Sequence, residues 1–141
     1  MKKSILIIVF LFLISCSTSK KSFVQKPLFE VLTEQIDGGA SIRFFEIVTE
    51  LDEIKMLQND PLLKNKIKVE DIQNSNFIIL NSGEKNSEGY KFEIESAVET
   101  DKNIIITIKE ISPEPNKKEL QVYTNPYCVV KINSKKEIII K

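Results

Sequence analysis

The sequence predicts an α+β domain that is mostly antiparallel β, sandwich-like or barrel-like, with one amphipathic helix laid on the sheet. Residues 76–94 organise this prediction: an apolar run at 77–80, a loop that contains two glycines, and then a segment in which Tyr90, Phe92 and Ile94 alternate with charged residues. A short apolar run between turn signals is typical of a buried strand, and a period of two is typical of a half-buried one. Strand-like segments follow to the end of the chain, and one segment upstream has a helical period.

Residues 28–35 and 41–48 are the first two predicted strands. Between them lies Asp37-Gly38-Gly39, whose residues adopt positive φ at low energetic cost and therefore favour a tight turn. We predict that the two strands form a hairpin.

Residues 49–59 change from a period of two to a helical period. Leu51, Ile54 and either Leu57 or Gln58 fall on one face, and Thr49 precedes Asp52 by three residues, which is the spacing of a capping box. Asp60-Pro61 predicts the end of the helix, because the residue before a proline avoids helical geometry. Residues 62–74 show no clear period, and we predict a short strand or a turn there.

The C-terminal half consists of predicted strands separated by turns. The segment at 103–111 is rich in β-branched residues and fits a central strand, entered by a turn at 99–102. A loop at 112–118 contains two prolines, and the remaining strands are predicted at 120–124, 127–133 and 137–140. Asn125-Pro126 separates two of them, because proline cannot donate a ladder hydrogen bond.

The first residues carry signals of export and lipid attachment. Lys2 and Lys3 precede an apolar run at 5–14, which is too short to span a bilayer and has the length of a signal peptide core. The following Leu13-Ile14-Ser15-Cys16 resembles the lipobox of bacterial lipoproteins. We therefore expect a signal peptide at 1–15, a lipidated flexible tether at 16–27 and a single domain at 28–141. An ordinary signal peptide with a coincidental cysteine, and an uncleaved anchor, are the alternatives.

Composition argues against most catalytic and cofactor chemistry. The chain has no His, only four Gly and no phosphate-binding loop motif, so Ser-His-Asp catalysis and the usual zinc sites are excluded. Acidic and basic residues are equal in number, and no basic stripe with interleaved aromatics indicates nucleic-acid binding. Cys128 has no activating base in the sequence, and Glu93 and Glu95 are typical of a solvated strand face. We expect a protein that is not an enzyme and that binds no metal, cofactor or small-molecule substrate.

The loop from Gly83 to Tyr90 is the remaining candidate for function. It is either a hairpin loop, in which Gly89 provides backbone freedom and Tyr90 enters the core, or an exposed recognition loop on a rigid sheet. On the second interpretation, the partner-binding residues are Glu84, Lys85, Asn86, Ser87, Glu88 and Tyr90. Tyr90, together with Tyr127, would also support the loop.

Two motifs resemble a known family. The segment 77–90, FIILNSGEKNSEGY, is similar to the G-E-x-x-x-G-G-Y segment of the PrcB C-terminal domain, and 125–132, NPYCVVKI, is similar to its S/T-x-P-Y-x-x-V-K-I/V segment. The Pro-bearing loop at 111–115 and the Gly-Gly at 38–39 resemble the family more loosely. Over residues 76–140, where the resemblance is strongest, this chain departs by having Glu88 where the family favours Gly and Cys128 where a His is common.

The resemblance implies a lipoprotein subunit that associates with a secreted protease, stabilises it or assists its maturation. We therefore expect a non-enzymatic protein-binding module, held by acyl chains such as palmitate on Cys16 to the bacterial cell envelope, at the outer membrane or the periplasmic face. Two alternatives remain: a structural envelope lipoprotein without a protease partner, and a protease inhibitor, because the loop faintly resembles that of chagasin-type inhibitors.

Overall fold

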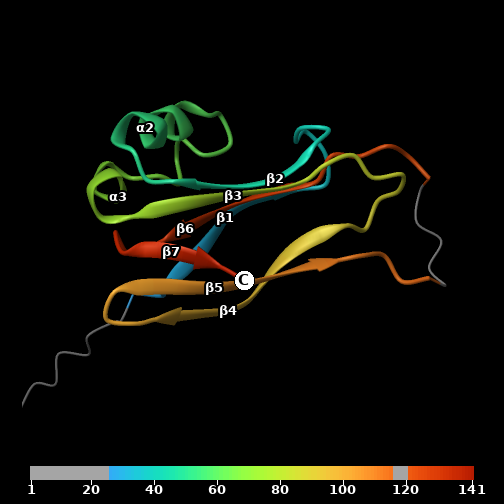
Figure 1. The fold of residues 1–141 in the computed structure, drawn as a ribbon. Coiled ribbons are helices and arrows are strands. Elements are labelled where there is room, and N and C mark those ends of the chain that lie inside the picture. The colour runs from blue at the N-terminus through green and yellow to red at the C-terminus, as the bar shows by residue number, and fades with distance from the viewer. Residues whose placement is uncertain (1–25, 116–120) are drawn as a thin grey trace, which may run out of the picture.

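Two β-sheets packed face to face form the body of the protein (Figure 1). The computed structural model describes residues 26–115 and 121–141, so the predicted signal peptide, Cys16 and most of the predicted tether lie outside the described residues. The first sheet is antiparallel and has the order β1-β6-β3-β2, from strands Phe29–Gln35, Tyr127–Ile132, Asn76–Ser82 and Arg43–Val48. The second has the order β4-β5-β7, from strands Lys91–Glu99, Asn103–Ile111 and Glu137–Ile140.

The mostly antiparallel α+β class is confirmed, and the sheets do not close into a barrel. Within the described residues only the β5–β7 pair is parallel. Each sheet keeps two free edges, so the sandwich-like form of the prediction is right and the barrel-like form is wrong.

The main core lies between the two sheets. Ile78, Leu80 and Val130 from the first sheet pack into one cluster with Ile104 and Ile106 from the second, and all five are fully buried. Phe45 and Phe92 meet edge to face across the layers, with ring centroids 5.4 Å apart. Burial of large aliphatic and aromatic side chains stabilises each by about 1.5–3 kcal/mol, so this interface is the main source of stability.

Two short helices cover the outer face of the first sheet (Figure 1). Helix α2 spans Leu51–Asn59 and helix α3 spans Val69–Asn74. Ile54 is completely buried and packs with Phe77 and other residues in a second cluster beneath the helices: Leu32, Val48, Leu63, Ile67 and Val129. The helices therefore close a second core on the opposite side of the same sheet.

The helix predictions need two corrections. Helix α2 ends at Asn59 with Asp60 as its C-cap, as Asp60-Pro61 predicted. Its N-cap is Glu50, which makes no side-chain capping bond, so the predicted capping box of Thr49 and Asp52 is absent. Helix α3 replaces the strand or turn predicted in 62–74. It escapes a periodicity search because its Val69 is exposed while its Asp71 is buried.

The predicted hairpin of the first two strands is wrong, and so is the hairpin alternative for residues 83–90. Strands β1 and β2 lie at opposite edges of the first sheet, with β6 and β3 between them, although Gly38 has the positive φ expected of a turn glycine. Strands β3 and β4 belong to different sheets, so residues 83–90 cross between the layers and do not form a hairpin loop. Of the strand predicted at 120–124, the described residues form only a single bridge between Thr124 and Lys85.

Candidate functional site

Three segments that are far apart in the sequence meet at one end of the sandwich. We call residues 37–42, 81–90 and 124–127 the loop cluster. It includes the last two residues of β3 and the first residue of β6. The Gly39 N–H donates to the Asn125 carbonyl at 2.9 Å, and the Glu84 N–H donates to the Ser41 carbonyl at 3.0 Å. Lys85 and Thr124 exchange two backbone hydrogen bonds of 2.8 and 3.0 Å. The segments that resembled a known family therefore form one hydrogen-bonded unit.

Asn81 holds the centre of the loop cluster. Its Oδ1 accepts from the Ala40 N–H at 2.9 Å, while its Nδ2 donates to the carbonyls of Ala40 at 2.8 Å and Ile42 at 2.6 Å. Only an amide side chain both donates and accepts in this way, and Asn81 is 1% exposed. Sequence analysis did not identify this residue; the available signal was a polar residue directly after the apolar run of β3.

Two glycines permit the close approach of the segments. A Cβ on Gly39 would lie inside van der Waals contact with Asn81 Oδ1 and 2.7 Å from the Asn125 carbonyl oxygen. Gly83 has φ +73°, and a Cβ there would lie 2.8 Å from the Arg43 backbone nitrogen. Larger residues at these positions would separate the strands that the cluster joins.

An ion-pair bridge ties the loop cluster to the second sheet. Lys85 Nζ lies 2.8 Å from Glu110 Oε1 on β5, and Arg43 Nε on β2 lies 3.3 Å from Glu110 Oε2. Burial disfavours the Glu110 carboxylate, but the hydrogen bond and charge of Lys85 outweigh this effect and hold the pKa of that carboxyl below its ordinary value. Lys85 also lies over the Tyr90 ring, 4.9 Å from its centroid. The crossing loop is therefore held at both its start and its end.

The predicted partner-binding residues divide into two groups. Glu84 and Asn86 are exposed, and Glu88 is partly exposed, so these side chains are available to a partner. Lys85 instead pairs with Glu110, and Ser87 is buried with its carbonyl accepting from Thr124 Oγ1 at 3.1 Å. Tyr90 lies beneath Lys85, and the other predicted support, Tyr127, packs on the core under the helices. The family favours Gly at position 88, but the backbone here does not require one. Among the described residues only glycines have a positive φ, so Glu88 adopts a conformation that is open to any residue.

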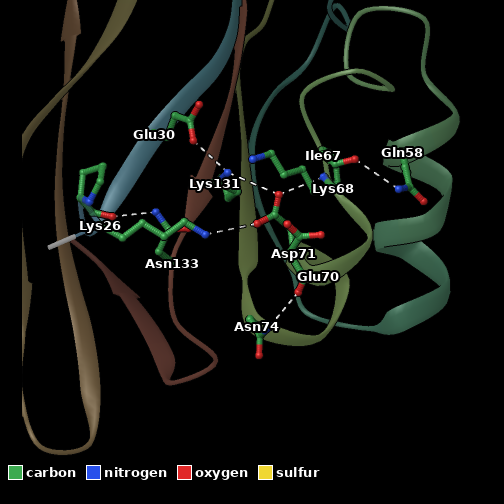
Figure 2. Close-up of polar contacts among 11 residues, drawn as sticks. Lys26, Glu30, Gln58, Ile67, Lys68, Glu70, Asp71, Asn74, Lys131 and Asn133 are labelled. Atoms are coloured by element: carbon green, nitrogen blue, oxygen red, sulfur yellow. Dashed lines mark hydrogen bonds and ion pairs between the residues drawn. The ribbon is translucent and has the colours of Figure 1, made fainter. Parts of the chain in front are cut away.

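The second motif contributes a buried ion pair on the helix side of the first sheet (Figure 2). Lys131 is 4% exposed and its Nζ lies 2.8 Å from Glu30 Oε2 and 3.4 Å from Asp71 Oδ2 on α3. Asp71 is 1% exposed and also accepts from the Lys68 N–H at 2.9 Å and pairs with Lys26 at 3.5 Å. This cluster fixes α3 and the entering chain against β6.

The charges of this cluster stabilise one another. Burial disfavours the charged form of Asp71, but the Lys68 N–H and the charges of Lys131 and Lys26 hold the pKa of the carboxyl below its ordinary value. Burial likewise disfavours the ammonium of Lys131, but Glu30 and Asp71 raise its pKa above the ordinary value. Both groups therefore remain charged at neutral pH, and their role is structural because both are closed to solvent.

Cys128 lies in the core between the sheets. Its side chain is 2% exposed, and burial, with a smaller contribution from the charge of Glu34, raises the pKa of the thiol to about 12. A thiol in that state is a poor nucleophile, because the thiolate is the reactive form. No group of three or more His, Cys, Asp or Glu within 26–115 and 121–141 is placed to hold a metal ion.

We expect Cys128 to resist thiol reagents in the folded protein. In a Cys16→Ser variant of the full chain, where Cys128 is the only thiol, Ellman's reagent at pH 8 should react at least a hundredfold more slowly in buffer than in denaturant. At a pKa of about 12 only about one thiol in ten thousand is ionised at that pH. Equal rates in both solutions would show that the thiol is accessible and activated.

The comparisons with known proteins identify the segment that contains most of the loop cluster. No curated protein and no solved structure was found to match the chain. Within the described part of the chain, neither helix has the length and hydrophobicity of a membrane span. A family model described as PrcB C-terminal matches residues 76–133, from the start of β3 to the end of β6. This match includes Asn81, the crossing loop and Lys131, so the interpretation of both motifs is confirmed. Residues 76–133 of this chain thus match the PrcB C-terminal family, as the two motifs predicted.

Proposed function

We propose that this chain is a non-enzymatic protein-binding module of a membrane-anchored envelope lipoprotein, and that its partner is a protease. The family resemblance implies the partner class, and the lipobox at Leu13–Cys16 implies the anchor. The alternatives are a structural envelope lipoprotein and a chagasin-like inhibitor of the same kind of enzyme.

The proposal rests on the loop cluster, which combines a fixed backbone with exposed polar side chains. The backbone of 83–90 is held by hydrogen bonds to Ser41 and Thr124, and the Lys85 side chain is held by Glu110. Glu84 and Asn86 are exposed. Binding residues on loops act best when a rigid scaffold fixes them, since little conformational entropy is then lost on association. The exposed side chains of the loop, Glu84 and Asn86, are polar groups of the kind that a protein partner can bind.

The role of the loop is tested by changing only its exposed side chains. The Glu84→Ala/Asn86→Ala variant should lose at least tenfold of its partner recovery, because residues central to an interface each contribute about 2 kcal/mol or more. The native lipidated protein is crosslinked in the cells that produce it, extracted in mild detergent, and its neighbours are identified by mass spectrometry.

The matched control is Asp101→Ala/Lys102→Ala in the β4–β5 turn, at the other end of the second sheet. It should recover the same protease as the unaltered chain. Recovery of envelope structural proteins alone supports the structural alternative, and a recovered protease that is inactive supports the inhibitor. Equal recovery with both double variants would exclude the loop as the binding site. The mass of the N-terminal peptide from the same sample tests lipid on Cys16, and an unmodified Cys16 would contradict the anchor.

A further inference from the structure

A groove lies between helix α2 and the edge of the first sheet, outside the loop cluster. It has a volume of about 340 Å³ and is lined by Glu46 and Val48 of β2, Ile79 of β3, and Glu53, Met56 and Leu57 of α2. The register of β2 explains why these residues meet. Glu46 pairs with Ile79 and Val48 with Phe77, so both project to the face that the helices cover.

The floor of the groove is apolar and its rim is acidic. Val48 is 3% exposed, and Leu57 and Ile79 are half-buried, whereas the Met56 side chain at the lip is 73% exposed. A flexible methionine at a lip adapts to differently shaped apolar partners. Glu46 and Glu53 are both exposed, and neither has an ion-pair partner among residues 26–115 and 121–141. The groove thus favours an apolar group that carries positive charge beside it.

The strand that borders the groove also has an open backbone edge. Strand β2 is the last of the β1-β6-β3-β2 sheet, so its N–H and C=O groups on the side away from β3 have no strand partner in the described chain. Such an edge is a template for an added strand, with main-chain hydrogen bonds giving affinity and side-chain pockets giving specificity. An extended peptide is therefore a better occupant than a compact ligand.

We infer that β2 and the groove beside it form a second interaction surface, which binds an extended segment of a partner protein that carries an apolar residue with a lysine or arginine two positions before it and two positions after it. Side chains two positions apart lie on the same face of a strand, so all three face the groove. The added strand pairs with the free edge of β2. Its apolar side chain enters between Val48, Leu57 and Ile79, and its two basic side chains reach Glu46 and Glu53. This surface shares no residue with the loop cluster, so it does not depend on the proposed protease partner.

The test uses three labelled peptides and the purified full-length chain, with binding followed by fluorescence anisotropy. The peptides are Gly-Lys-Thr-Leu-Thr-Lys-Gly, in which both lysines share the face of the leucine, the same sequence with both lysines replaced by glutamate, and the same sequence with leucine replaced by alanine. We expect the first to bind at least tenfold more tightly than either of the others, and its advantage over the acidic peptide to shrink at about 0.5 M salt, where exposed charges are screened.

Charge reversal gives the sharpest outcome. The Glu46→Lys/Glu53→Lys variant should prefer the acidic peptide over the basic one. The matched control, Glu95→Lys/Asp101→Lys, changes the charge equally at exposed carboxylates of β4 and of the β4–β5 turn, and should keep the original preference. Unaltered preference in the groove variant, or reversed preference in the control, would overturn the assignment. So would failure of all three peptides to bind, which is expected if Glu46 serves only to block edge pairing.

Discussion

The Lys131→Met variant is expected to lower the free energy of unfolding by about 3–5 kcal/mol, because it leaves the buried Asp71 carboxylate without its buried counter-charge. Asp71 would retain the Lys68 N–H at 2.9 Å and Lys26 at 3.5 Å, but Lys26 is 60% exposed and shields it poorly. The loss is measured by equilibrium unfolding in urea.

The matched control for this variant is Lys55→Met. Lys55 forms a shorter ion pair, 2.9 Å with Asp52, but their side chains are 57% and 93% exposed. Exposed pairs contribute about 0–1 kcal/mol, so this variant should be nearly neutral. The double variant Lys131→Met/Asp71→Asn should regain much of the stability, since it removes the unpaired charge and keeps an acceptor for Lys68. Equal losses for Lys131→Met and Lys55→Met would contradict the role assigned to burial.

The buried charges of Asp71 and Lys131 should also be visible in the pH dependence of stability. Because the pKa of Asp71 is lower in the folded state, its contribution is present above the ordinary value of 3.8 and is lost as the pH falls through the folded pKa. Because the pKa of Lys131 is higher in the folded state, its contribution is present below 10.5 and is lost as the pH rises through the folded pKa. The double variant should therefore show a flatter stability profile at both extremes than the unaltered chain.

The Gly39→Ala variant is expected to cost about 3 kcal/mol or more. The added Cβ would overlap Asn81 Oδ1 and lie 2.7 Å from the Asn125 carbonyl oxygen. Overpacking costs about 1–3 kcal/mol by itself, and displacing Asn81 would also weaken its buried hydrogen bonds. Urea unfolding measures the loss, and the same variant should weaken any binding that depends on the loop cluster.

Gly38→Ala separates crowding from backbone strain. Gly38 has φ +104°, but a Cβ there would meet only the Tyr127 ring, at an ordinary 3.5 Å. Strain at a positive φ costs about 1–2 kcal/mol, so Gly38→Ala should be the milder change. A larger loss at Gly38 than at Gly39 would mean that the loop moves aside at Gly39 and that the segments are not held as described.

Sequence patterns located the strands better than they paired them. The apolar run at 77–80 and the alternation at 90–95 are local signals, and they coincide with β3 and with the first half of β4 in the structure. Pairing depends on residues distant in sequence: β6 and β3 separate β1 from β2, and no local signal contains that information. The same limit applies to the site, because nothing in the order Glu84, Lys85, Asn86, Ser87 indicates that Lys85 turns toward Glu110 or that Ser87 is buried beside Thr124.

The antiparallel pairing of β1 with β6 has a mechanical consequence. Pro27 and Lys26 are attached at the start of β1, next to Asn133 and Asp71, whereas β1 ends at Gln35 opposite Tyr127, beside the loop cluster. Seven residues of strand separate these two points by about 23 Å. A load pulling on the N-terminal segment while a partner holds the loop cluster would run along β1. The β1–β6 ladder would then be sheared, so its hydrogen bonds would share the force and fail together, not open one after another like a zipper.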